Sequence, residues 1–125
     1  MERDLIPEDL QRFIAAHIDS IAHIEALLLL RASKSAAWSA STLANRIYVD
    51  EATAKEVLRR LQVDGLARLE GERYCFGCNS SEKEQMVERL AEAYRRFLIP
   101  VTNLIHATPR RIRQFADAFR LRKGT

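Results

Sequence analysis

Residues 43–66 decide the fold, and they read LANRIYVDEATAKEVLRRLQVDGL. Ser41 is placed to cap a short helix, and Asp50 is a good N-cap for a longer helix that follows a tight turn. Apolar residues recur along the longer helix at steps of three and four, and Gly65 is suited to end it in the left-handed conformation. The pattern therefore predicts a short helix, a tight turn and a longer helix, whose apolar face consists of Ala54, Val57, Leu58 and Leu61.

The residues before this stretch predict further helix. Pro7 suits the first position of a helix, and apolar residues then recur at helical spacing to about Arg31. Ser20 lies in the middle of this pattern and is a good N-cap, so the sequence allows either one long helix or two helices with a break. Small and polar residues then surround Trp38, which we interpret as part of a loop or a very short strand whose ring fills the core.

The residues after this stretch predict a hairpin and then more helix. Residues 66–69 and 73–76 are strand-like and flank a turn that contains glycine. Ser81 begins a capping box for a long helix, in which Pro100 is expected to introduce a kink. Thr108 is placed to cap a last helix.

These elements fit one domain, since 125 residues are about one domain's worth and bury enough surface for a core. We expect a mostly α-helical protein: a winged helix-turn-helix with flanking N- and C-terminal helices and a short β-hairpin wing. The N-terminal helix occupies residues 1–19, the winged helix-turn-helix residues 20–78, and C-terminal helices for dimerisation residues 79–125.

The central stretch resembles the MarR-type winged helix-turn-helix regulators of bacteria. In that family a Leu-Ala start, a capped recognition helix and a Leu-x-x-(Asp/Glu)-Gly-Leu exit into the wing recur. Here these features are Leu43-Ala44, Asp50 and residues 61–66, which read LQVDGL. The match covers about residues 20–78.

The resemblance implies a DNA-binding transcriptional regulator whose partner is double-stranded DNA. Helix 51–64 would enter the major groove, and the wing at 66–77 would reach toward the minor groove or the backbone. Thr53 suits contact with a base edge, Lys55 suits a phosphate, and Arg59 suits either. The residues expected at the DNA are Thr53, Lys55, Glu56, Arg59, Arg60, Arg46 and Arg73.

An apolar seam along the C-terminal helices predicts a homodimer. Its residues step by fours and threes, and the rest of one chain is expected to leave this stripe poorly covered. Paired DNA half-sites also require a two-fold partner. The alternative is that the seam packs on the first helix of the same chain. The residues expected at the dimer interface are Leu10, Phe13, Met86, Leu90, Phe97, Leu104, Phe115 and Phe119.

The net charge of +3 is unevenly distributed along the chain. Residues 1–80 hold ten basic and twelve acidic residues, whereas residues 81–125 hold ten basic and five acidic residues. The acidic side chains on the expected recognition helix and wing repel phosphate. They motivate a rival function, a winged-helix module for protein–protein interaction without sequence-specific DNA binding; these side chains are Glu51, Glu56, Glu70 and Glu72.

Cys75 and Cys78 form a lone Cys-x-x-Cys motif at the end of the wing. A structural zinc site needs four ligands, and no second cysteine pair exists, so we expect no metal site. A thiol or metal sensor on the same fold is a third hypothesis, although two reduced thiols are the usual state in the cytoplasm.

Other motifs that carry chemistry are missing from the sequence. There is no glycine-rich phosphate loop and no arguable order of nucleophile, base and acid, so we expect neither enzymatic activity nor a cofactor. Asp19 and His23 stand four residues apart on one helix face and could hydrogen bond, but no nucleophile accompanies them, so they are interpreted as structural or surface residues. The longest apolar run covers only residues 26–30 and the N-terminus is unlike a signal peptide, so we expect a cytoplasmic protein without a membrane span.

Overall fold

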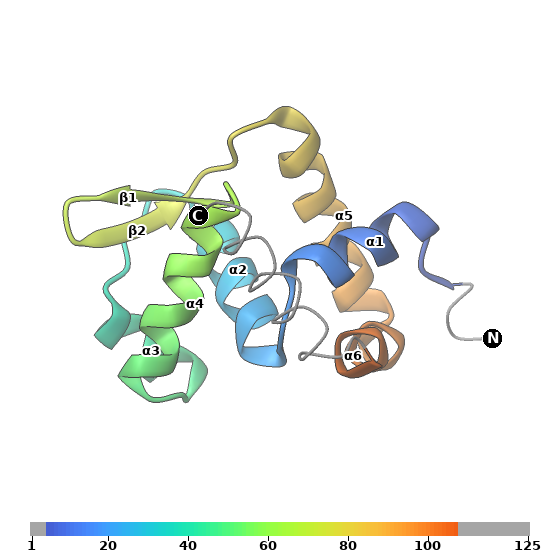
Figure 1. Ribbon diagram of the computed structural model, residues 1–125, viewed down its shortest axis with the longest axis horizontal. Coiled ribbons are helices and arrows are strands. Elements are labelled where there is room, and N and C mark those ends of the chain that lie inside the picture. Colours follow the sequence, from blue (N-terminus) through green and yellow to red (C-terminus); the bar gives the residue numbers. More distant parts are fainter. Residues whose placement is uncertain (1–4, 108–125) are drawn as a thin grey trace, which may run out of the picture.

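The computed structural model describes residues 5–107, and within them the chain is mostly helical with a small antiparallel two-stranded sheet (Figure 1). This class of fold was expected from the sequence and is confirmed. At one end of the molecule α1 packs against α5 and α6; at the other lie α3, α4 and the hairpin, with α2 between them. The elements are α1 (Glu8–His17), α2 (Ile21–Ala32), α3 (Ala40–Ile47), α4 (Glu51–Val63), β1 (Ala67–Glu70), β2 (Arg73–Phe76), α5 (Ser81–Arg96) and α6 (Leu98–Ala107).

The N-terminal helical pattern folds as two helices. Ile18 and Ser20 adopt extended backbone conformations, and the Ser20 hydroxyl accepts a hydrogen bond from the backbone N–H of His23 (3.1 Å), which caps α2. The axes of α1 and α2 are therefore bent by 105°. Among the described residues, no single helix combines the length and apolar character needed to cross a membrane.

The connection before α3 carries a single β-bridge. The Trp38 N–H donates to the Tyr74 carbonyl (2.7 Å) and the Tyr74 N–H donates to the Trp38 carbonyl (2.8 Å), so the very short strand expected here is present. The ring of Trp38 is buried in the core. The predicted cap at Ser41 was wrong, because Ser39 and Thr42 form a reciprocal capping box two residues earlier.

The hairpin pairs Ala67 with Phe76 and Glu70 with Arg73, which leaves a two-residue turn. Gly71 occupies the first turn position with φ of +65°, as a type II′ turn requires. Gly65, which leads from α4 into the hairpin, has φ of +75° and lies so close to the side chain of Asn79 that a β-carbon would collide with it.

The C-terminal helix breaks earlier than the expected kink at Pro100. The Ser80 hydroxyl, one residue before the predicted cap, accepts from the N–H of Lys83 (3.2 Å) to start α5, and α5 ends at Arg96. A proline ring clashes with the carbonyl four residues before it, so a helix containing Pro100 cannot continue through Arg96. Pro100 instead lies in the first turn of α6, where its missing N–H leaves no hydrogen bond unmade.

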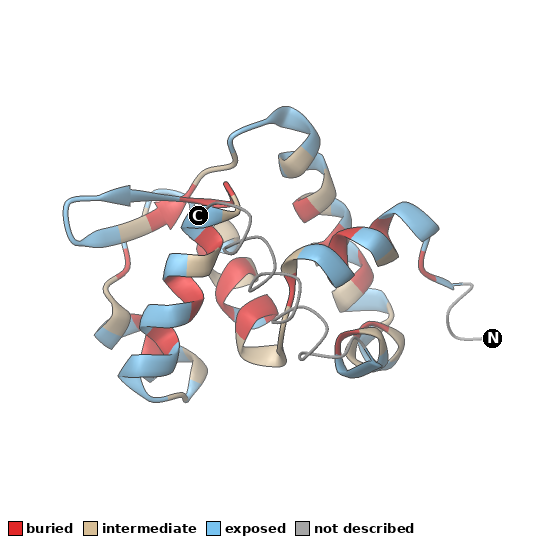
Figure 2. Cartoon of the chain, viewed as in Figure 1, coloured by how far each residue is buried: buried red, intermediate tan, exposed pale blue. Residues whose placement is uncertain are grey.

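The expectation that the seam is poorly covered within one chain was wrong. Leu10, Phe13 and Leu90 are buried in the chain's own core, where α1 packs against both α5 and α6 (Figure 2). Met86, Phe97 and Leu104 are partly buried against the same core. The bend between α1 and α2 leaves α1 free to cover the seam. Phe115 and Phe119 lie outside the described residues.

Candidate nucleic-acid interface

Helix α4 has one face in the core and one face open to solvent. It packs against α2, α3 and β1 through its buried residues Ala54, Val57, Leu58 and Leu61, all of which the helical spacing predicted. Thr53, Lys55, Glu56 and Arg59 lie on the opposite, exposed side. The structure therefore leaves four of the expected contact residues of this helix accessible.

Asp50 fixes the first turn of α4. Its carboxylate accepts a hydrogen bond from the backbone N–H of Thr53 (2.7 Å), and hydrogen bonds from the Thr53 side chain and backbone lower the pKa of Asp50 below its ordinary value. The cap thereby fixes Thr53 in the first turn of α4, on the exposed side of the helix.

The expected cations outside α4 are also exposed. Arg73 begins β2 at the tip of the hairpin, opposite Glu70. Arg46 lies on α3 with its guanidinium 5.5 Å from the ring centre of Trp38, a cation–π distance. The buried tryptophan thereby orients Arg46 from the core side.

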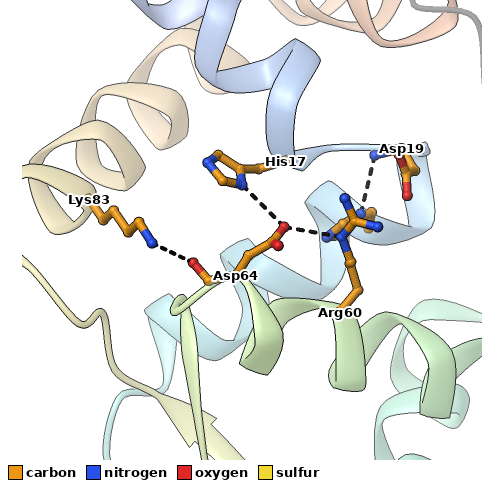
Figure 3. A network of polar contacts seen from close by, with 6 residues as sticks. His17, Asp19, Arg60, Asp64 and Lys83 are labelled. Atoms are coloured by element: carbon orange, nitrogen blue, oxygen red, sulfur yellow. Dashed lines mark hydrogen bonds and ion pairs between the residues drawn. The ribbon is translucent and has the colours of Figure 1, made fainter. Parts of the chain in front are cut away.

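Arg60 is the least exposed of the expected contact residues on α4. Its Nε donates to Oδ2 of Asp64 (3.2 Å), and its side chain is only 28% exposed. Nδ1 of His17 lies 3.1 Å from the same oxygen (Figure 3). The guanidinium of Arg60 is thus engaged with a carboxylate beside α1, at the border of the open face of α4.

Asp64 joins three helices at the C-terminal end of α4. Burial raises the pKa of its carboxyl, but hydrogen bonding to His17 and the charge of Arg60 outweigh this and leave the pKa below its ordinary value. Its backbone carbonyl accepts from Nζ of Lys83 on α5 (2.7 Å; Figure 3). The orientation of α4 is consequently coupled to α1 through His17 and to α5 through Lys83.

Asp19 and His23 interact through the backbone of Asp19 and the side chain of His23. The backbone N–H of Asp19 donates to Nδ1 of His23 (3.2 Å), so the neutral imidazole carries its proton on Nε2. His23 is 2% exposed, and burial is the main cause that lowers its pKa to about 4. The pair borders a hollow of about 340 Å³, which Thr53, Glu56 and Arg59 of α4 also line.

The charges of the α3–α4–hairpin segment nearly cancel. Residues 39–76 contain six basic and six acidic residues. Two acids are internally engaged, Asp50 in the cap and Asp64 in the ion pair with Arg60. The exposed acids are those that motivated the rival hypothesis, namely Glu51, Glu56, Glu70 and Glu72.

The two cysteines are placed unfavourably for a disulfide with each other. The backbone pairing of the hairpin continues beyond Phe76, since the N–H of Gly77 donates to the Leu66 carbonyl (3.4 Å). An extended chain advances about 3.3 Å per residue, so three residues of extended backbone span about 10 Å, more than the roughly 7 Å between Cα atoms that a disulfide allows. Burial raises the pKa of Cys78 to about 11, and no cluster of three or more metal-ligating side chains occurs within residues 5–107.

Comparison with known proteins assigns no function to this chain, so any functional argument rests on the geometry of the structure. No family model, curated protein or solved structure matches this chain.

Two features of the structure were not predicted from the sequence. The contact between His17 and Asp64 joins residues 47 positions apart, which no local pattern signals. The left-handed cap at Tyr48 was also missed, because α3 lacks the glycine that usually supplies such a cap.

Proposed function

We propose that this chain is a winged-helix DNA-binding protein that acts as a transcriptional regulator, with α4 as its recognition helix. The observation that carries the proposal is the two-sided character of α4, whose inner face is buried while Thr53, Lys55 and Arg59 are exposed. The bridge between Trp38 and Tyr74 supports it, because this bridge holds the hairpin beside α4 as a wing requires.

The proposed protein acts as a homodimer, since two recognition helices on successive major grooves need a two-fold partner. Leu98 and Ile99 support this part of the proposal, because they are 50% and 59% exposed on α6. Helix α6 lies at the opposite end of the molecule from α3 and the hairpin (Figure 1). Ile99→Glu is expected to convert the dimer into a monomer in sedimentation equilibrium. An unchanged mass would place the dimer interface elsewhere.

The test is fluorescence anisotropy with labelled genomic DNA fragments at several salt concentrations. Each phosphate contact contributes about −0.9 to the slope of log K against log salt. The double variant Lys55→Ala, Arg59→Ala is therefore expected to bind more weakly and to have a slope that is smaller in magnitude by about 1.8.

A charge-matched control separates contact from overall charge. Arg12→Ala combined with Arg95→Ala removes the same charge from exposed side chains of α1 and α5. This control is expected to bind DNA like the wild type. Equal losses in both double variants, or no binding by the wild type at low salt, would contradict the proposal.

The rival function is a winged-helix module that binds another protein, and the exposed acids of α4 and the hairpin favour it. Glu56→Lys distinguishes the two functions because they predict opposite effects. For a DNA-binding protein the change removes a repulsive charge and raises non-specific DNA affinity. For a module that meets a basic partner, it abolishes recovery of a stoichiometric partner protein.

A further inference from the structure

Tyr48 has an unusual backbone conformation and an unusual exposure. It ends α3 in the left-handed region with φ of 59° and ψ of 48°, and it is the non-glycine residue with positive φ within residues 5–107. Its side chain is 93% exposed. A β-carbon is disfavoured in this conformation, and for a bulky residue it is a genuine outlier.

The fold uses the backbone of Tyr48 but not its ring. The N–H of Tyr48 donates to the carbonyl of Ala44, as does that of Val49 (3.1 Å), and together they close the end of α3. Glycine performs this capping role with less strain. Nothing in the described part of the chain packs on the tyrosine ring enough to hide it, so the side chain has no structural use that offsets the strain.

The position of Tyr48 links it to the proposed recognition helix. It lies two residues before Asp50, the cap of α4, and hence at the same end of α4 as Thr53. In a helix-turn-helix docked on DNA, the N-terminal end of the recognition helix enters the major groove, so the turn that precedes it lies beside a backbone strand. A phenolic hydroxyl donates readily to a phosphate oxygen.

We infer that Tyr48 is a DNA-backbone contact, whose hydroxyl donates a hydrogen bond to a phosphate at the edge of the groove that α4 enters. This inference rests on the proposed function. Because the side chain is uncharged, its contact releases no counterion and contributes nothing to the salt dependence. The contact therefore adds affinity and fixes the position of α4 without requiring a positive charge on a face whose basic and acidic residues nearly cancel.

The test combines DNA affinity, salt slope and thermal stability for Tyr48→Gly and Tyr48→Phe. Both variants are expected to lose on the order of ten-fold in affinity, as for a hydrogen bond to a charged group, with an unchanged salt slope. Tyr48→Gly is also expected to melt at a higher temperature, because the strain is relieved. Tyr94→Phe on α5 is the matched control and is expected to leave affinity unchanged.

Three outcomes would overturn the inference. If the wild type binds DNA and both Tyr48 variants bind equally well, Tyr48 is not a contact, while the proposed function stands. If the wild type binds no DNA but Tyr48→Gly abolishes binding of a partner protein, the residue serves protein recognition and the proposed function fails as well. If Tyr48→Gly melts at a lower temperature, the ring stabilises the fold and its conformation needs no external partner.

Discussion

Acidification from about pH 7 to about pH 5 is expected to destabilise this protein through His23. The imidazole is buried and its pKa is lowered from 6.5 to about 4, chiefly by burial. The unfolded chain therefore takes up a proton first as the pH falls below 6.5, so the stabilisation is present above 6.5 and is lost progressively toward pH 4. The difference between the two pKa values of His23 corresponds to about 3 kcal/mol of folding stability in total. Roughly 2 kcal/mol of this stability is lost by about pH 5.

The groups that face His23 are Asp64, Arg60 and His17. The nearby carboxylate raises the pKa of His23, whereas the arginine and the second histidine lower it. The lowered pKa of Asp64 adds a further loss of stability, but only at more acidic pH as its carboxylate is protonated. The acid branch of the stability curve thus has two parts, and His23 accounts for the part nearest neutrality.

The assay is urea denaturation at a series of pH values for the wild type and for His23→Asn. The asparagine side chain retains an acceptor for the backbone N–H of Asp19 and cannot be protonated. It also leaves His17 in place, so the difference between the two curves isolates His23. The wild-type free energy of unfolding is expected to fall more steeply between pH 7 and 5; parallel curves would refute the reasoning.

Further substitutions test the backbone, the core and the thiols. Gly65→Ala is expected to cost several kcal/mol in urea denaturation because it combines positive φ with a collision, whereas Gly71→Ala in open space is expected to cost only about 1 kcal/mol. Leu90→Ala is expected to lower the free energy of unfolding by about 2–5 kcal/mol independently of protein concentration, because the side chain is buried within one chain. After treatment with peroxide, mass spectrometry of the folded protein is expected to find no disulfide between Cys75 and Cys78. Detection of this disulfide would contradict the extended geometry.

The parts of the fold that were predictable from the sequence are those set by local chemistry. The buried face of α4 follows from helical spacing, and Asp50 caps this helix as its side chain suggested. Gly71 marks a hairpin turn because its conformation excludes most other residues. In each of these cases one residue and its near neighbours determine the structure.

The parts that were not predictable depend on contacts between distant segments. Ser39 and Ser41 are chemically equivalent caps, and the bridge made by Trp38 next to Ser39 favours the earlier one. Coverage of the seam depends on the bend between α1 and α2, which places Leu10 against the C-terminal helices. Local sequence patterns do not show which distant segments pack together.

The candidate site shows the same division. Exposure of Lys55 and Arg59 follows from the phase of α4, which its apolar residues fix. Arg60 is on the border of that face, and its direction is decided by Asp64 and by His17 on another helix. A helical wheel is compatible with either side for such a border residue. The side to which its side chain turns is decided by its tertiary partner.

The pairing of charges determines how strongly one chain is expected to bind DNA. Since Arg60 is engaged with Asp64, the expected contact cations that remain exposed are Arg46, Lys55, Arg59 and Arg73. Four phosphate contacts correspond to a salt slope of about −3.6 for a single chain. If a slope near twice this value comes from a second chain on the DNA, Ile99→Glu is expected to halve it. If the steep slope survives Ile99→Glu in a protein shown to be monomeric, the additional phosphate contacts come from the same chain, where residues 108–125 carry six basic side chains and lie outside the described part.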